Sequence, residues 1–208
     1  MIYQIYEWHI LQNINYLPRY LCFLISEEEM KHDLNQIIRI IRWCNEISSY
    51  IQKKCIKENG IEEIMIHISA SSESIDTSYY SKIRELSGFC KLCLYYGDKK
   101  EKTGSGLPVI VVIGKSGREE IADAIRAMAK DNVGPEEVSS EVLEKYLTFS
   151  HTPDCIIKTG GAHLVDFLIW QSVYSEFFFL DLNWERIRKI DLLRAFRDYQ
   201  ARSRRFGA

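Results

Sequence analysis

The C-terminal segment, residues 182–208, holds the side chains best suited to binding phosphate. It carries eight Arg or Lys against three acids and ends in Arg205, Phe206 and Gly207. Arginine offers a rigid fork of N–H donors that matches phosphate oxygens, and glycine lets the backbone approach a ligand closely. This end of the chain is therefore a candidate binding segment for a phosphorylated compound. Taken in isolation, a frayed basic terminus would be the simpler interpretation.

The acidic run at residues 26–29 indicates the opposite chemistry. Ser26 and Glu29 have the spacing of a capping box, in which each side chain accepts a hydrogen bond from the other residue's N–H. That arrangement occupies the donors that a phosphate would use at a helix start. Glu27, Glu28 and Glu29 would each repel a unit of phosphate charge by roughly 2–3 kcal/mol at about 6 Å and an effective dielectric of about 20. We predict no diphosphate site here.

Two further patterns have plainer explanations than catalysis. Residues 114–116 read Gly-Lys-Ser, as in a phosphate-binding loop, but Val109 stands where that motif requires its first glycine. His163 and Asp166 suit acid–base chemistry, yet no nucleophile is identifiable with them. A polar helix start is the better interpretation of that pair.

Composition predicts one ordinary globular domain. The 208 residues are 46% hydrophobic and 27% charged, with a formal net charge of −2, which favours neither a polyanion-binding protein nor a disordered chain. No apolar run approaches the roughly 18 residues needed to span a bilayer, and the N-terminus lacks the pattern of a signal peptide. We expect a cytoplasmic protein, with peripheral contact to a membrane as an open alternative.

The cysteines predict reduced, buried thiols rather than a metal site. Only Cys90 and Cys93 have metal-like spacing, and neither a second pair nor a nearby histidine accompanies them. The six cysteines, at positions 22, 44, 55, 90, 93 and 155, lie scattered through apolar segments.

Short apolar runs alternate with helical patterns along the chain. Six runs are predicted as buried strands: 20–25, 64–68, 91–95, 109–113, 155–157 and 177–180. This alternation predicts an α/β fold, with a mostly parallel six-stranded sheet flanked by helices in a single domain. Ligands of such sheets bind beyond the carboxyl ends of the strands.

The N-terminal segment, residues 1–17, is predicted as an amphipathic helix rich in aromatic residues. It has few charges, whereas a helix lying on a membrane surface usually carries a lysine-rich polar face. Packing onto the body of the protein is therefore favoured over membrane contact. The remaining residues, 18–208, form the main domain with its basic tail.

Three segments in the last third of the chain resemble the cis-prenyltransferases, which include undecaprenyl and dehydrodolichyl diphosphate synthases. They are residues 153–161 (PDCIIKTGG), 167–181 (FLIWQSVYSEFFFLD) and 192–207, which ends in Arg-Phe-Gly. Residues 17–20 resemble the segment before the family's first strand, and Gly117 and Arg118 fall where its Gly-Gly-Arg turn lies. The resemblance covers roughly residues 17–208.

The resemblance implies an undecaprenyl diphosphate synthase-like fold and a dimer that joins isopentenyl diphosphate to an allylic diphosphate. Such enzymes use Mg²⁺ and an aspartate loop after the first strand. The Arg-x-Gly tail of one subunit reaches the isopentenyl diphosphate held by its partner, a role that falls here on Arg205, Phe206 and Gly207. Phe177, Phe178 and Phe179 would be either a buried strand or part of the dimer contact.

This chain departs from the family pattern at its phosphate ligands. Ser26 stands at the catalytic aspartate position, and Leu164 stands where the family has an arginine. Lys158 keeps a charge but lacks arginine's fork, so it is at most a vestigial phosphate ligand. Glu176 lies where the family places an acid near Mg²⁺, and without the aspartate an interface role is at least as good an explanation.

We therefore expect a non-catalytic subunit of a heteromeric cis-prenyltransferase, with no catalytic residue and no metal of its own. Its tail would complete the active site of a catalytic partner subunit, which would hold the Mg²⁺ and the isopentenyl diphosphate. One alternative is a divergent homodimeric cis-prenyltransferase that is active by itself. Another is an isoprenoid-binding or interaction protein without transfer activity.

Overall fold

The computed structural model describes residues 2–55, 60–70, 77–97, 99–149, 151–161 and 168–202. Within these residues a seven-stranded sheet has the order β4-β3-β5-β2-β1-β6-β7. The strands are β1 (Tyr20–Ser26), β2 (Glu63–Ser69), β3 (Lys91–Tyr96), β4 (Lys99–Thr103), β5 (Pro108–Ile113), β6 (Cys155–Lys158) and β7 (Glu176–Phe179). All neighbours pair in parallel except β3 and β4, which form an antiparallel hairpin.

The predicted single-domain α/β fold is confirmed, with one strand more than expected. The six predicted runs match six of the strands to within one or two residues. The additional strand is β4, whose sequence KKEKT has no apolar residue and therefore gives no signal of a buried strand. It lies at the edge of the sheet, where charged side chains reach solvent.

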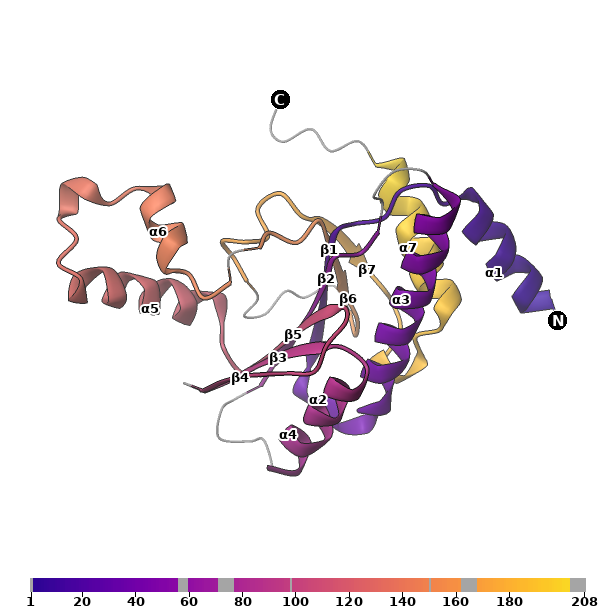
Figure 1. The fold of residues 1–208 in the computed structure, drawn as a ribbon, viewed down its shortest axis with the longest axis horizontal. Coiled ribbons are helices and arrows are strands. Elements are labelled where there is room, and N and C mark those ends of the chain that lie inside the picture. The colour runs from indigo at the N-terminus through magenta and orange to yellow at the C-terminus, as the bar shows by residue number, and fades with distance from the viewer. Residues whose placement is uncertain are drawn as a thin grey trace.

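Helices cover mainly one face of the sheet. The α-helices are α1 (Ile2–Asn13), α2 (Glu27–His32), α3 (Asn35–Lys54), α4 (Thr77–Arg84), α5 (Gly117–Lys130), α6 (Ser140–Tyr146) and α7 (Lys189–Ala201). Figure 1 shows α1, α3 and α7 on the same side of the sheet. The apolar stripe of α3, which includes Ile37, Ile40, Cys44 and Ile47, is buried there in the main core. By contrast α5 and α6 extend away from the sheet, and we call residues 117–146 the arm (Figure 1).

The N-terminal helix α1 packs against α7. Ile10 and Ile14 belong to the main core, and the Gln200 side chain donates a 2.7 Å hydrogen bond to the carbonyl oxygen of Asn13. Ile5 and Trp8 on the same helix remain exposed. In the described part of the chain, none of the helices has the length and apolar character required to cross a bilayer.

The second face of the sheet, opposite α3, carries a row of side chains in register across all seven strands. The row consists of Lys102, Cys93, Ile110, Met65, Cys22, Ile156 and Phe177. Phe149 and Leu168, from loops, pack over its centre. Cys93 and Ile110 stay partly exposed in a groove of about 350 Å³. By the residues that the structure describes, this face is only partly covered.

All six cysteines are free thiols, as predicted. Cys22, Cys44, Cys90 and Cys155 are buried, while Cys55 and Cys93 are partly exposed. Burial raises the pKa of the Cys90 thiol to about 11, so this thiol stays protonated near neutral pH.

Candidate functional site

The carboxyl ends of the parallel strands meet at one edge of the sheet. There β1 ends at Ser26, β2 at Ser69, β5 at Ile113 and β6 at Lys158. In α/β sheets, ligands bind at this edge. Two helices start directly after β1 and β5, and helix starts offer N–H groups to anions. Whether this edge of the sheet can bind an anion therefore depends on the partners of the N–H groups at these two helix starts.

The start of α2 is closed by the predicted capping box. The Ser26 N–H donates to Oε2 of Glu29 at 2.9 Å, and the Glu29 N–H donates to Oγ of Ser26 at 3.2 Å. The Ser26 hydroxyl in turn donates to Oε2 of Glu29 at 3.1 Å. The side chains of this helix start thus accept two of its own backbone N–H groups, and the predicted capping box of Ser26 and Glu29 is confirmed.

The Glu29 carboxylate also binds parts of the chain far away in sequence. The Trp184 N–H donates to Oε1 of Glu29 at 3.3 Å. The same oxygen lies against Gly160, where an added Cβ would come within 2.9 Å of it, and Gly160 has a φ of +67°. A side chain at position 160 would meet both the strained backbone and the carboxylate. Glu29 therefore fills the space between the ends of β1 and β6 with the negative charge of the protein itself.

The carboxylates at this position do not fit the Mg²⁺ that the family resemblance implies. Glu29 accepts from Ser26 and Trp184, and the carboxylate of Glu27 forms an ion pair with Lys31. Mg²⁺ needs free carboxylate oxygens in octahedral geometry, usually together with waters and substrate phosphates. Across the described residues, no group of three or more His, Cys, Asp or Glu side chains could hold a metal ion.

The start of α5 is closed in the same way. The Ser116 N–H donates to Oε2 of Glu119 at 2.9 Å, and the Glu119 N–H donates to Oγ of Ser116 at 3.1 Å. The backbone N–H of Gly114 donates to the carbonyl oxygen of Ile68 at 3.0 Å. The N–H groups of Gly114, Ser116 and Glu119, which a phosphate-binding loop would offer to its ligand, are therefore already bonded within the protein.

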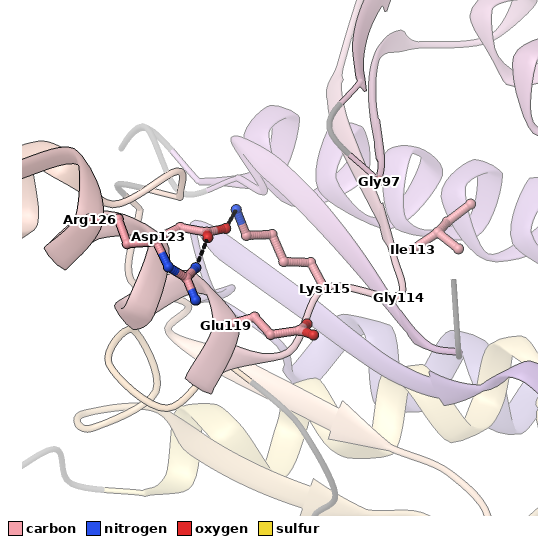
Figure 2. A pocket seen from close by; sticks show the side chains of 7 residues that line it. All are labelled: Gly97, Ile113, Gly114, Lys115, Glu119, Asp123 and Arg126. Atoms are coloured by element: carbon pink, nitrogen blue, oxygen red, sulfur yellow. Dashed lines mark hydrogen bonds and ion pairs between the residues drawn. The ribbon is translucent and has the colours of Figure 1, made fainter. Parts of the chain in front are cut away.

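A pocket of about 290 Å³ lies beside this helix start (Figure 2). Figure 2 shows Lys115 and Arg126 pointing toward Asp123, with N···O distances of 3.1 Å and 2.7 Å. The hydrogen bond from Lys115 lowers the pKa of Asp123, so this carboxylate is ionised at neutral pH. With Glu119 at the rim, the two positive charges are balanced by two negative ones. Among the lining residues that the structure describes, there is no surplus of positive charge for a diphosphate.

Lys158 and Glu176 lie at opposite ends of neighbouring strands. Lys158 ends β6 and its ammonium donates to the carbonyl oxygen of Thr159, which places it at the same edge as Ser26. Glu176 begins β7 in register with Cys155, whereas Lys158 is in register with Phe179. The Glu176 carboxylate accepts a 2.9 Å hydrogen bond from Arg202. Lys158 and Glu176 are therefore not members of one site in this chain.

The three phenylalanines of β7 have different environments. Phe178 is 7% exposed and belongs to the main core. Phe177 and Phe179 stack on the second face with ring centroids 6.1 Å apart, and Phe179 is 45% exposed. Of the residues predicted at an interface, Phe177 and Phe179 reach the surface, while the side chain of Phe178 is taken up by the core.

Some predicted residues lie outside the described part of the chain. These are His163, Leu164 and Asp166, and the tail residues Arg205, Phe206 and Gly207. Sequence reasoning also missed two contacts that the structure describes, Glu29 with Trp184 and Arg202 with Glu176. The first pair is separated by 155 positions in the sequence and the second by 26, and no local spacing predicts pairs so far apart.

Comparison with known proteins identifies the family. The family model described as "Putative undecaprenyl diphosphate synthase" matches residues 1–207. The chain belongs to this cis-prenyltransferase family. The matched residues include the capped starts of α2 and α5 described above.

Relatives in the cis-prenyltransferase family align over about half of the chain. A tritrans,polycis-undecaprenyl-diphosphate synthase (geranylgeranyl-diphosphate specific) of Methanocaldococcus jannaschii is 39% identical over 121 residues, which are 54% of this chain and 43% of that protein. An isoprenyl transferase of Thermus thermophilus is 40% identical over 121 residues, 53% of this chain and 46% of that protein. The chain thus spans less than half the length of these relatives.

Solved cis-prenyltransferase structures share the fold over nearly the whole chain. A probable undecaprenyl diphosphate synthase from Campylobacter jejuni superposes with a TM-score of 0.66 at 18% identity, covering 94% of this chain and 100% of that one. Lavandulyl diphosphate synthase from Lavandula x intermedia, in complex with dimethylallyl diphosphate, superposes with a TM-score of 0.65 at 19% identity, covering 92% of this chain and 99% of that one. At these identities the likeness concerns the fold alone.

Proposed function

We propose that this chain is the non-catalytic subunit of a heteromeric cis-prenyltransferase. In this proposal a catalytic partner subunit holds Mg²⁺, the allylic diphosphate and isopentenyl diphosphate. The tail of the present chain, with Arg205, Phe206 and Gly207, completes the partner's site. The product is a polyprenyl diphosphate.

The observation that carries the proposal is the occupied start of α2. Oxygen atoms of Glu29 accept the N–H groups of Ser26 and Trp184, which a substrate diphosphate would otherwise find free. A diphosphate entering here would have to displace that carboxylate and approach two further glutamates. Both effects disfavour binding, because the displaced carboxylate loses its hydrogen bonds and like charges repel.

The surface of the protein supports a subunit role. Strands of a mostly parallel sheet are normally covered on both faces, yet the second face here keeps a partly open groove, in which Cys93 and Ile110 lie beside charged residues such as Lys102. At the β7 edge, Val173, Tyr174 and Phe179 are exposed together with the partly exposed Phe177. An exposed apolar surface of this kind is typical of a contact with another chain.

Mixing purified proteins tests the proposal. The partner is a homologue from the same organism with an intact aspartate loop, and the measurement is incorporation of radiolabelled isopentenyl diphosphate with Mg²⁺. We expect the mixture to be active and this chain alone to be inactive, and Arg205→Ala to weaken the activity of the mixture. A mixture no more active than the homologue by itself would contradict the proposal.

The second candidate is a divergent homodimeric cis-prenyltransferase that works alone. The relatives favour it, because they are named as synthases or transferases, and none of those quoted is named as an accessory subunit. The same assay separates the two candidates. The second candidate would be established, and the first refuted, if this chain alone incorporated isopentenyl diphosphate in the presence of Mg²⁺ and lost that activity when its own residues were substituted.

A further inference from the structure

Arg202 marks the point where α7 ends and the basic tail begins. It is the C-terminal capping residue of α7, and its N–H donates to the carbonyl oxygen of Tyr199 at 3.1 Å. Its guanidinium donates to Oε2 of Glu176 at 2.9 Å and to the carbonyl oxygen of Phe177 at 3.1 Å. The same group lies over the ring of Phe178, with Cζ 4.1 Å from the ring centroid.

These contacts connect the end of α7 to a rigid strand. Both ends of β7 are hydrogen-bonded to β6 or to the residue before it. The Glu176 N–H donates to the carbonyl oxygen of Asp154, and the N–H of Leu180, directly after β7, donates to that of Lys158. Phe178 is buried in the core, so the surface under the guanidinium cannot move freely. An exposed ion pair contributes little alone, but a charged hydrogen bond combined with a cation–π contact holds a side chain more firmly.

The other arginines of α7 do not reach the sheet in this way. Arg197 pairs with the adjacent Asp198, and Arg194 pairs with Asp191 one turn earlier. Both arginines also interact with Tyr6 of α1, but none of these contacts reaches the sheet. Arg197 is therefore a matched control for Arg202, since it has the same charge, lies on the same helix and is equally exposed at 44%.

We propose that Arg202 and Glu176 form a tail anchor, which fixes where the C-terminal segment leaves the body. The anchor rests on the proposed function, because its purpose is to position Arg205 for the diphosphate in the partner's site. Arg205 follows Arg202 by three residues, so its Cα lies at most about 11 Å from the anchored Cα. In this proposal Glu176 is a positioning residue: it binds Arg202, whereas the family has an acid near Mg²⁺ at this position.

The test measures steady-state kinetics of the mixed enzyme with isopentenyl diphosphate as the varied substrate. For Arg202→Ala and Glu176→Gln we expect KM to rise about 3- to 10-fold with kcat nearly unchanged, because a misplaced tail weakens ground-state binding. Arg202→Lys should raise KM less than Arg202→Ala does, because lysine keeps the positive charge. Arg202→Glu combined with Glu176→Arg should bring KM back to the wild-type value. Arg197→Ala should match the wild type.

Two kinetic outcomes would overturn the anchor. One is an Arg202→Ala variant with the KM of the wild type. The other is a parallel loss of kcat and of affinity for the partner with KM unchanged, which would mean that Arg202 only supports the fold.

A second measurement separates the anchor from the proposed function. Backbone ¹⁵N relaxation of this chain alone reports the order of the amides in residues 203–208. We expect lower order parameters there in Arg202→Ala than in the wild type or in Arg197→Ala. Equal values would refute the anchor even if the mixture is active. Lower values in a chain that activates no partner would leave the anchor standing and refute the proposed function.

Discussion

Glu29 is the residue on which the chemistry of the carboxyl edge depends. One carboxylate group accepts hydrogen bonds from its own helix start and from Trp184, and it lies against Gly160. These three places belong to α2, the loop after β6 and the turn before α7. A single side chain therefore both closes a possible anion site and connects three segments of the fold.

Substitution of Glu29 should show this connecting role in stability. Glu29→Ala removes the acceptor for two backbone N–H groups, and we expect the free energy of unfolding to fall by about 1–3 kcal/mol. Glu29→Gln keeps one oxygen acceptor and the reach of the side chain, so it should cost less. Urea denaturation followed by tryptophan fluorescence measures both.

Glu119→Ala is the matched control for Glu29→Ala. Glu119 makes an equivalent capping box at α5, but it is exposed, and the hydrogen bonds described for its side chain are all with Ser116. We expect a loss of about 0.5–1 kcal/mol for the local cap alone. If both alanine variants lost the same free energy, the contact between Glu29 and Trp184 would have no role in stability.

At the scale of elements, most of the fold follows from local patterns. Apolar runs predicted six strands, because burial of a strand leaves a pattern that the sequence shows directly. The start of α2 was also predictable, since Ser26 and Glu29 interact within one turn. The strand β4 was not, because an edge strand of lysines is stabilised by pairing with β3 rather than by its own burial.

The candidate site was predictable only in part, for a physical reason. Sequence comparison located Ser26, Lys158 and Glu176 individually, but the placement of Lys158 and Glu176 at opposite strand ends depends on the register of β6 and β7. The Glu176 contact with Arg202 likewise depends on where α7 ends in space. Tertiary pairing of this kind leaves no periodic signal in a single sequence.

The arm is held to the body by a buried acid, Glu120, which is 1% exposed. The Phe149 N–H donates to Oε1 of Glu120 at 2.9 Å, and the Gln171 side chain donates to Oε2 at 3.1 Å. Burial raises the pKa of Glu120 above its ordinary value, although these hydrogen bonds and the charge of Lys115 act in the opposite direction.

The raised pKa of Glu120 predicts how stability changes with pH. Between the ordinary pKa of 4.5 and the raised value, the folded protein keeps a proton that the unfolded chain releases. The contribution of Glu120 to the free energy of unfolding is therefore greatest below 4.5 and falls as pH rises through the raised pKa. We expect the wild type to lose stability relative to Glu120→Gln as pH increases from 4.5.

Urea denaturation of both proteins across this range gives the difference directly. Groups shared by the two proteins, including Asp123 with its lowered pKa, cancel in the comparison. A difference that is constant with pH would contradict a raised pKa at Glu120.

At the scale of the whole molecule, the partly covered second face predicts contact with a partner chain. Phe179→Asp places a charge on the exposed edge of β7, and we expect the affinity for a catalytic partner to fall at least about 10-fold. Ile5→Asp is the control, since Ile5 is 63% exposed on α1, which packs against α7. Size-exclusion chromatography with light scattering measures both complexes, and equal affinities would exclude β7 from the interface.

The charged strand β4 bears on how such assemblies can grow. A sheet has two edges, and each is a place where a further strand can add. Lys99, Lys100 and Lys102 place positive charges along the β4 edge, so another copy of that edge would be repelled, while the opposite edge at β7 presents phenylalanine. We therefore expect another chain to add at the β7 edge rather than at the β4 edge, and a single contact edge favours a closed pair of chains over an open fibre.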